Sequence, residues 1–329
     1  MIHHILYLLS LQSILTAVSA FYFPVATSGQ VKKGVATAFR SVDRTGVSCD
    51  IVLARNSSGQ PIAFRDFCPH RGMSFDGATV TTEDSVVCGY HGFSFDLGHS
   101  RGQLKQGLGV SGSCAQLSVV QTFELGGLVW VKPSESLFMP DFPPEEFDAA
   151  YRSVRGFTDI CAPLENVIEN VCDSLHLGFV HSFGNPENPE PYDYKAKRTS
   201  PIRGEASFQY LAGPTSLSKV FSRRSVVDVD NWFHLPSTVG TRVTAGSDVK
   251  VVCVHACRLS LTETRVFWCL YRNWLTWPCL DPLISWIMQF TLCEDKAVLE
   301  QCKHIRSSLH SRYDKLQRLY RRASDENSV

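Results

Sequence analysis

The chain has 329 residues, enough for two domains of ordinary size, each with its own hydrophobic core. Hydrophobic residues make up 44% and charged residues 19%, which excludes a disordered or low-complexity chain. The 32 basic and 32 acidic residues cancel, and nucleic-acid binding, which usually needs a basic surplus, is therefore not expected. Twelve cysteines are too few for a disulfide scaffold of this length, so metal ligation is the first use to consider.

Residues 1–20 form an apolar leader that ends in the small residues Val18-Ser19-Ala20. This pattern is typical of a signal-like segment, although it begins without Lys or Arg. A membrane anchor over residues 1–26 is a second interpretation, because a spanning helix needs ~20 apolar residues. An ordinary buried helix is a third, and the sequence leaves all three open. The Ala20-Phe21 junction also shows a short resemblance to the bipartite plastid-targeting signals of algae.

Short β-strands are expected from residue 21 to about residue 132. The segments Ile51–Arg55 and Pro61–Arg65 flank a turn-forming stretch around Gly59, which predicts a hairpin. Residues 133–144 are rich in Pro, Ser and Asp and are typical of a linker. The elements expected beyond it are a helix over 165–183, long antiparallel strands over 204–272 and one long helix over 293–322 with apolar residues at i+3/i+4 spacing.

Two short loops in the β-rich part each supply one Cys, one His and one Gly. The ligand candidates are Cys68 and His70 in the first loop and Cys88 and His91 in the second. Thiolates suit a soft iron centre, imidazoles on one iron raise its reduction potential, and the glycines let backbone N–H groups approach bridging sulfides. With both thiolates on one iron and both imidazoles on the other, the loops predict a 2Fe-2S cluster. A structural zinc site is the alternative, but zinc loops more often repeat one ligand type.

These loops resemble those of the Rieske family. Rieske proteins of respiratory and photosynthetic complexes carry an additional disulfide beside the ligands, whereas Met73 and Tyr90 occupy the neighbouring positions here. The resemblance therefore implies the oxygenase or ferredoxin branch and a reducing compartment inside the cell, with a plastid or membrane-anchored location left open.

A second group of candidate ligands lies in the segment from Asn170 to His181, which also contains Asp173 and His176. Two imidazoles and one carboxylate form the facial triad of non-haem Fe(II) oxygenases and leave positions for O₂ and substrate. Residues five apart on a regular helix point about 140° away from each other, so the two histidines could not share a metal there. Gly178 lies between them and predicts that the helix ends or distorts at that point.

The spacing Asn-x-x-Asp-x-x-His-x-x-x-x-His resembles the iron-site motif of Rieske non-haem iron oxygenases, and the resemblance extends over residues 21–322. It implies that Asp295 is the third iron ligand, with Glu294 facing solvent or lying behind the ligands. Without this resemblance, Asp295 would be interpreted as an acidic residue of the kind favoured in the first turn of a helix. It also implies that Asn170 lies near the iron.

The resemblance gives Asp173 a separate role. Its carboxylate is implied to hydrogen-bond His176 of its own chain and the cluster ligand His91 of a neighbouring subunit. Electrons would then cross a head-to-tail interface, which implies a ring of subunits and hence a homotrimer.

The implied fold is α+β, with an N-terminal Rieske β-domain over residues 21–137. A helix-grip, START-like catalytic domain with a curved antiparallel sheet follows over residues 138–329. The implied activity is O₂-dependent hydroxylation or oxidative demethylation of a small aromatic or polycyclic substrate. A ferredoxin or reductase supplies the electrons, which come indirectly from NAD(P)H. The single-chain organisation resembles the vanillate- and dicamba-type demethylases, whereas the pheophorbide a oxygenase-like chloroplast enzymes usually extend further.

Two further features of the sequence are less specific. Four tryptophans, Trp268, Trp274, Trp277 and Trp286, precede Asp295, and we expect them to pack in the core, with the lining of an apolar pocket as the alternative. Basic residues recur along the last expected helix, where a solvated face is the default and a docking patch for an acidic electron donor the sharper hypothesis. They are Lys303, Arg306, Arg312, Lys315, Arg318, Arg321 and Arg322.

Two other classes of protein remain possible on the sequence. A Rieske electron-transfer protein with a non-catalytic ligand-binding domain would keep His70 and His91 but lack a working triad. A secreted glycoprotein is suggested by the leader and by the Asn56-Ser57-Ser58 sequon. Labile Fe–S ligation and the need for a reductase argue against the second of these.

Overall fold

The structure, a computed structural model, describes residues 22–98, 102–107, 109, 115–132, 139–216, 225–303 and 310–327. The expected leader and the first half of the expected linker, residues 133–138, lie outside this described part of the chain. No helix within the described residues is long and apolar enough to cross a membrane.

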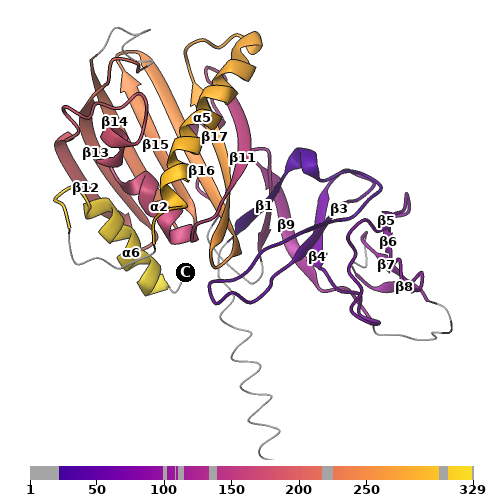
Figure 1. Ribbon diagram of the computed structural model, residues 1–329. Helices are drawn as coiled ribbons and strands as arrows, with labels where there is room; N and C mark the ends of the chain where they lie inside the picture. Colours follow the sequence, from indigo (N-terminus) through magenta and orange to yellow (C-terminus); the bar gives the residue numbers. More distant parts are fainter. Residues whose placement is uncertain are drawn as a thin grey trace, which may run out of the picture.

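The N-terminal part of the chain folds into two antiparallel sheets (Figure 1). The larger sheet has the strand order β1-β10-β9-β4-β3-β2, and the smaller one has the order β5-β6-β7-β8. The hairpin expected around Gly59 is confirmed, because β3 pairs with β4 with Ile51 opposite Arg65. The strands are β1 (Phe23–Thr27), β2 (Thr37–Phe39), β3 (Ile51–Arg55), β4 (Pro61–Arg65), β5 (Thr79–Val80), β6 (Ser85–Val87), β7 (Ser94–Asp96), β8 (Leu104–Gln106), β9 (Val119–Leu125) and β10 (Leu128–Lys132), with the 3-10 turn η1 (Ser28–Gln30) after β1.

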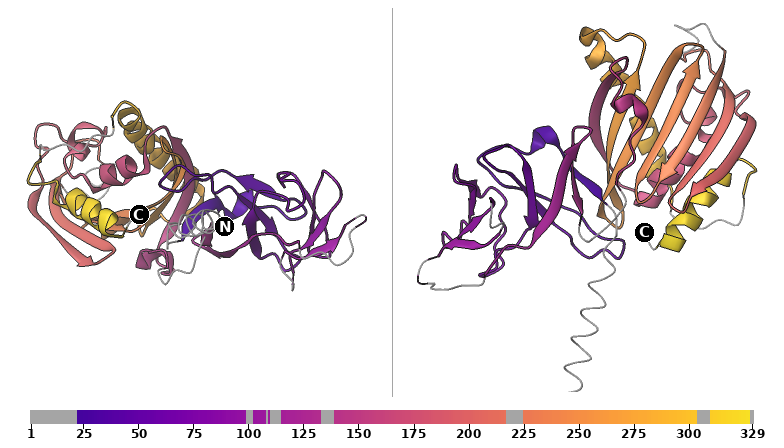
Figure 2. Two further views of the ribbon diagram at one scale, coloured as in Figure 1. Left: turned by 90° about the horizontal axis from the view of Figure 1, so that it is seen from below. Right: turned by 180° about the vertical axis from the view of Figure 1, so that it is seen from behind.

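The C-terminal part of the chain forms one curved antiparallel sheet with the order β11-β17-β16-β15-β14-β13-β12 (Figures 1 and 2). The long antiparallel strands expected over residues 204–272 are confirmed. The strands are β11 (Arg152–Ile160), β12 (Tyr192–Ser200), β13 (Arg203–Leu211), β14 (Val226–His234), β15 (Thr238–Ala245), β16 (Asp248–Ser260) and β17 (Glu263–Arg272). The helices are α2 (Leu164–Cys172), α3 (His176–Phe179), α5 (Asp281–Leu299) and α6 (Lys315–Asn327), with the 3-10 turns η2 (Pro144–Glu146) and η3 (Pro278–Leu280).

Alternating side chains explain why helices cover one face of this sheet. In β13, Ala206, Phe208 and Tyr210 are buried while the residues between them are exposed or half-buried, as expected for a strand with one covered face. Helices α2, α5 and α6 lie over that face, as the view from behind in Figure 2 shows. They contribute apolar side chains such as Ile168 and Leu316, both fully buried, to one continuous core.

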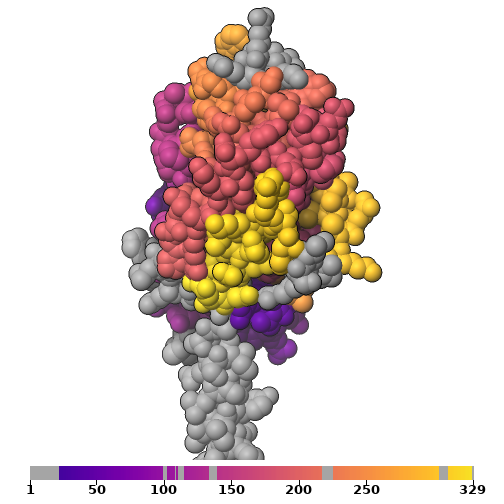
Figure 3. All heavy atoms as spheres, turned by 90° about the vertical axis from the view of Figure 1, so that its left-hand side faces the viewer, coloured from indigo at the N-terminus to yellow at the C-terminus, as the bar shows by residue number. Residues whose placement is uncertain are grey.

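The long helix expected over residues 293–322 is wrong. Helix α5 begins much earlier, at Asp281-Pro282, where proline suits a first helical turn, and it ends at Leu299. Helix α6 is a separate element, and it packs on strands β12 and β13 at the far edge of the sheet (Figure 3). The apolar i+3/i+4 pattern runs through both helices because both bury a face on the same core, so the pattern alone hides the break. Asp295 consequently lies near the C-terminal end of α5 rather than at a helix start.

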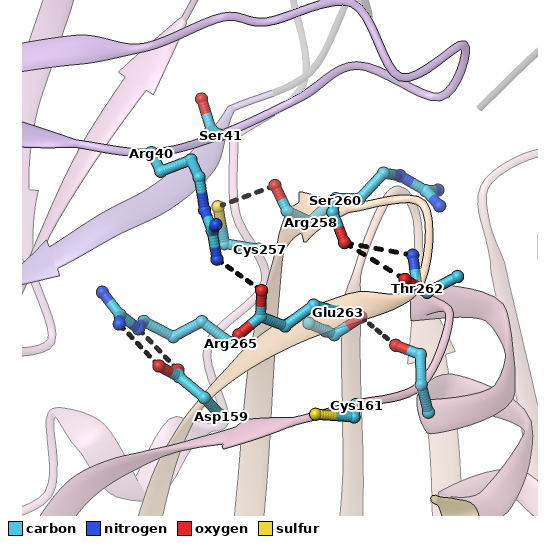
Figure 4. A network of polar contacts seen from close by, with 12 residues as sticks. Arg40, Ser41, Asp159, Cys161, Cys257, Arg258, Ser260, Thr262, Glu263 and Arg265 are labelled. Carbon is cyan, nitrogen blue, oxygen red and sulfur yellow. Dashed lines mark hydrogen bonds and ion pairs between the residues drawn. The ribbon is translucent and has the colours of Figure 1, made fainter.

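The two sheet systems are joined through the β16–β17 hairpin (Figure 4). The backbone N–H of Val42 donates a hydrogen bond of 3.0 Å to the carbonyl of Arg258, and Arg40 forms an ion pair with Glu263. The contact therefore combines a main-chain bond, which fixes the relative position of the two parts, with a charged pair at the surface.

A buried aromatic cluster lies beside this hairpin at the same junction. Leu128 and Trp130 of β10 pack with Phe267 of β17, and His255 of β16 lies edge-on to Trp130 at 4.9 Å between ring centroids. Strand β17 is therefore buried on both faces over most of its length, by the helices on one side and by the N-terminal part on the other.

Candidate metal centres and substrate cavity

The two cluster loops are built alike. In each loop the cysteine N–H donates to the carbonyl five residues later, that of Met73 or Phe93, at 2.8 Å. The glycine four residues after each cysteine has a positive φ, +70° for Gly72 and +68° for Gly92, which L-residues with a side chain rarely adopt. The backbone thus repeats one tight turn twice, and the glycine each loop carries is required by its φ value.

The four expected cluster ligands meet between these loops. Cys68 and Cys88 are both 2% exposed and their thiols lie next to each other, while the rings of His70 and His91 are 4.7 Å apart between centroids. His70 is exposed and His91 half-exposed. Two buried thiols on one side and two accessible imidazoles on the other fit a cluster with one iron inside and one near the surface.

The candidate mononuclear site begins with a break between α2 and α3. The helix expected over residues 165–183 is interrupted at Asp173, whose backbone is extended, and not at Gly178 as expected. The Asp173 carboxylate accepts a hydrogen bond of 2.8 Å from the N–H of Leu175, a local turn that aspartate favours. The chain then restarts at His176 in a new direction, which removes the angular conflict of a regular helix.

The break brings three candidate ligands together. The Nε2 atoms of His176 and His181 are 3.2 Å apart, and Asp295 Oδ1 lies 3.5 Å from each. Ligand atoms at right angles around a metal, each at about 2.1 Å, would be about 3.0 Å apart. The spacing and the neutral-imidazole and carboxylate donors therefore fit one divalent iron on three neighbouring corners.

Both imidazoles are held in the tautomer that metal binding needs. His176 Nδ1 donates to the main-chain carbonyl of Asp173 at 2.7 Å, and His181 Nδ1 donates to the Glu294 carboxylate at 3.0 Å. Each Nε2 is left with its lone pair directed at the shared site. The hydrogen bond expected from His176 to the Asp173 carboxylate is replaced by one to its carbonyl. Glu294 lies behind the ligands, the second of its two expected positions.

A hydrogen bond from Asn170 orients Asp295, and burial keeps His181 neutral. The Asn170 amide donates to Asp295 Oδ1 at 2.9 Å, which fixes a carboxylate that comes from a distant helix. Asp295 is 9% exposed and His181 7%. Burial lowers the pKa of His181, more than the neighbouring carboxylates raise it, so its imidazole is neutral near pH 7 as a ligand must be.

Two glycines give this loop its close packing. A Cβ added to Gly178 would lie 2.7 Å from the Cβ of Pro189, and one added to Gly184 would lie 2.3 Å from the carbonyl oxygen of Leu177. Gly178 therefore does not break the helix but allows α3 to pack against the following loop.

The candidate triad lies in the wall of a cavity of about 430 Å³, within the usual range for small-molecule sites. Its walls are mainly apolar, with residues from β14, β15, β16, β17 and α5, among them Val229, Val243, Val252, Val254, Leu270 and Met288. Trp268 packs in the core as expected. Trp274 and Trp286 line the cavity, which is the alternative position expected for them. Trp277 is 66% exposed and Trp286 64% exposed, so the expected core packing is wrong for these two side chains.

The basic residues near the C-terminus do not form one continuous helical face. Arg312 precedes α6 and pairs with Glu190 at 2.8 Å, while Arg321 pairs with Glu169 of α2 at 2.5 Å. Arg306 lies outside the described residues. A donor-docking patch here stays a prediction.

Comparison with known proteins supports this architecture. Residues 21–118 match the family described as Rieske 2Fe-2S domain, and residues 160–326 match the vanillate O-demethylase oxygenase C-terminal domain. A dicamba O-demethylase oxygenase component from Stenotrophomonas maltophilia is 26% identical over 204 residues, or 59% of this chain and 58% of that protein. The chloroplastic pheophorbide a oxygenase of Oryza sativa subsp. japonica is 26% identical over 191 residues, or 53% of this chain and 35% of that protein.

Solved structures agree in fold. The crystal structure of dicamba monooxygenase bound to dicamba superimposes with a TM-score of 0.77 at 20% identity, covering 93% of this chain and 96% of that one. A Rieske domain followed by a sheet-and-helix domain with a candidate iron site defines the class of Rieske non-haem iron oxygenases. The chain belongs to this class, and its C-terminal half belongs to the vanillate O-demethylase oxygenase family. The family's cofactors are a Rieske cluster and a mononuclear iron.

Proposed function

We propose that the chain is the oxygenase component of an enzyme that hydroxylates or oxidatively demethylates a small aromatic or polycyclic compound. The single observation that carries the proposal is the group of His176, His181 and Asp295 in the wall of a mainly apolar cavity. A demethylation would convert a methyl ether, dioxygen, two electrons and two protons into an alcohol, formaldehyde and water. The dicamba-type relatives favour demethylation over simple hydroxylation.

The residues would divide the work as follows. Cys68, Cys88, His70 and His91 would hold the cluster, within a Rieske domain proposed to span residues 21–137. The mononuclear ligands would belong to a catalytic domain spanning residues 138–329. When bound, the cluster supplies electrons one at a time and the iron supplies dioxygen activation. The chain's own side chains fix ligand tautomers, hold Asp295 in place and exclude water around the substrate.

The test is turnover by the iron-loaded full chain with a surrogate ferredoxin and reductase, NAD(P)H and a panel of aromatic methyl ethers and polycyclic compounds. Mass spectrometry should detect a product that carries one added oxygen or has lost one methyl group, with formaldehyde in the second case. The rival, an electron-transfer protein, predicts that iron beyond the cluster pair never binds. Iron quantitation in the wild type and in His176→Ala separates the two, since only the oxygenase loses iron on substitution.

We further propose a homotrimer in which Asp173 links the centres of neighbouring subunits. Sheet β5–β8 with its cluster loops lies at the end of the molecule away from the catalytic sheet (Figures 1 and 2), which favours transfer between subunits over transfer within one. Accessible His70 and His91 support contact with another chain.

Complementation tests this arrangement directly. Subunits carrying His91→Ala and subunits carrying His176→Ala should each be inactive, and mixed assemblies should regain part of the activity because one subunit's cluster serves the next one's iron. If mixed assemblies stay inactive although light scattering shows that trimers have formed, transfer takes place within one chain and the Asp173 link is wrong.

A further inference from the structure

An aromatic side chain lies on each of the two histidines in the cluster loops. Phe93 stacks on His70, with ring centroids 4.6 Å apart and ring planes 14° apart. Tyr90 lies over His91, with ring centroids 3.8 Å apart and a tilt of 37° between the planes. Both aromatic residues belong to the second loop, so Phe93 reaches across to the histidine of the first loop. The second loop therefore supplies a ring contact for both imidazoles.

These ring contacts stand where the mononuclear site has hydrogen bonds. The planes of His176 and His181 are fixed by hydrogen bonds from Nδ1 to a carbonyl and a carboxylate. Within the residues that the structure describes, the imidazoles of His70 and His91 take part in no hydrogen bond or ion pair. An imidazole with a single bond to a metal can turn about that bond unless a second contact fixes its plane. A stacked aromatic ring provides such a contact.

The support is firm for one histidine and weaker for the other. Phe93 is 8% exposed and belongs to the hydrophobic core that also contains Phe75 and Phe95. The chain at Gly107 packs on its ring, because a Cβ added to Gly107 would lie 3.5 Å from three of the ring carbons. Tyr90 is 56% exposed. Phe93 is thus held on several sides, whereas Tyr90 has its own freedom of movement.

Stacking differs from a hydrogen bond in what it leaves accessible. A stacked neighbour covers the face of an imidazole, whereas a hydrogen bond occupies the nitrogen at its edge that does not bind the metal. The proposed link between subunits requires this nitrogen of His91 to be free for the Asp173 carboxylate of the next chain. Orientation by stacking meets both requirements, since it fixes the ring and leaves the edge open.

We propose that Phe93 and Tyr90 are positioning residues for the cluster, and that they fix the planes of His70 and His91 by stacking. The inference rests on the proposed ligation of the cluster by these two histidines, and it adds the residues that orient them. Phe93 and Tyr90 act through the imidazoles and are not themselves catalytic.

The test is electron paramagnetic resonance of the reduced cluster in the full chain, because the g values and nitrogen couplings depend on the orientation of the imidazoles. Phe93→Leu should shift and broaden the signal and should release cluster iron to a chelator about tenfold faster than the wild type. Tyr90→Leu should change both quantities in the same direction but less, because this ring is less firmly held. Tyr90→Phe keeps the ring and should give the wild-type spectrum.

Phe95→Leu is the matched control. It removes a ring from the same core, where Phe95 packs on the ring of Phe75 and not on an imidazole. The variant should lower the melting temperature through lost packing and leave the spectrum and the rate of iron release unchanged. The same spectral change in Phe95→Leu as in Phe93→Leu would assign the effect to a loosened core and overturn the proposal.

The remaining outcomes are equally decisive. A wild-type spectrum in Phe93→Leu would overturn the role of Phe93. Tyr90 is exposed, so its two variants decide the matter even if Phe93→Leu does not fold, and identical spectra of Tyr90→Leu and Tyr90→Phe would then count against stacking. A changed spectrum in a chain that turns over no substrate would support the stacking role and count against the oxygenase function. Turnover with unchanged spectra would do the reverse.

Discussion

The two iron-binding regions of this protein are assembled in different ways. The four proposed cluster ligands lie between residues 68 and 91 on two loops with the same backbone hydrogen bonds. The candidate mononuclear site instead joins α2, α3 and α5, and the hydrogen-bonded pair Asn170 and Asp295 is 125 residues apart in the sequence. The first region depends on local turns, and the second depends on how helices pack on a sheet.

The difference also appears in what orients the ligands. Main-chain bonds and glycines with positive φ shape the cluster loops. Side chains from distant elements, Glu294 and Asn170, orient two of the three proposed mononuclear ligands. Substitutions should therefore affect the two regions separately and with different sensitivity.

Removal of one ligand from each region should have the largest effect. His176→Ala should lose the mononuclear iron and at least about a thousandfold of the turnover, while keeping the visible absorption of the cluster. Cys88→Ser should lose that absorption because a buried thiolate is missing. His310→Ala, an exposed histidine, serves as control. Loss of both centres in either variant would show that the regions are not independent.

Removal of a supporting side chain should be the next largest effect. Asn170→Ala and Glu294→Ala should each weaken iron binding by about ten- to a hundredfold, because the ligands they orient become free to rotate. Met73→Ala is the corresponding change in a cluster loop, and there the supporting bond is from the backbone, so cluster content should stay the same. Competition with an iron chelator and absorption spectra measure the two quantities.

Glycine substitutions should sharpen the comparison further. Gly184→Ala places a methyl group against main-chain oxygens and should lower the free energy of unfolding by about 2 kcal/mol. Gly72→Ala meets no atom within 4 Å and should cost about 1 kcal/mol through its φ alone. Gly72→Asn should be tolerated better than Gly72→Ala, since asparagine accepts positive φ, whereas Gly184→Asn should be worse than Gly184→Ala. Equal responses at the two positions would contradict this distinction.

The last expected effect concerns the junction between the two regions and its pH dependence. Burial lowers the pKa of His255 to about 3, whereas in the unfolded chain this pKa is about 6.5. Below pH 6.5 the unfolded chain therefore binds a proton that the folded chain does not bind, and the folded state loses stability. The contribution of His255 to the free energy of unfolding is constant above that pH, and it should fall by about 1.4 kcal/mol between pH 7.5 and pH 5.5. His255→Gln should lack it, while the term from His234, whose pKa burial also lowers, remains in both proteins. Denaturant unfolding at the two pH values measures the difference, and equal pH slopes would rule the effect out.

The ease of predicting each region from sequence follows the same division. The proposed cluster ligands and the β3–β4 hairpin are encoded by short-range spacing, and the structure brings those residues together. The sequence predicts the helix break at Gly178, whereas the structure has it at Asp173. A glycine can mark either a flexible point in the chain or a position with no room for a side chain. Only the close packing against Pro189 shows that Gly178 is the second kind. The ends of α5 and α6 were missed because two helices on one core share a periodicity.

His176 Nδ1–H donates its hydrogen bond to the main-chain carbonyl of Asp173 and not to a side chain. A peptide oxygen is common to every amino acid, so a scan of side-chain replacements at Asp173 would leave this anchor in place while altering the carboxylate. A loss of activity on replacement of Asp173 would therefore report on its carboxylate, which includes the hydrogen bond accepted from the Leu175 N–H as well as any external contact.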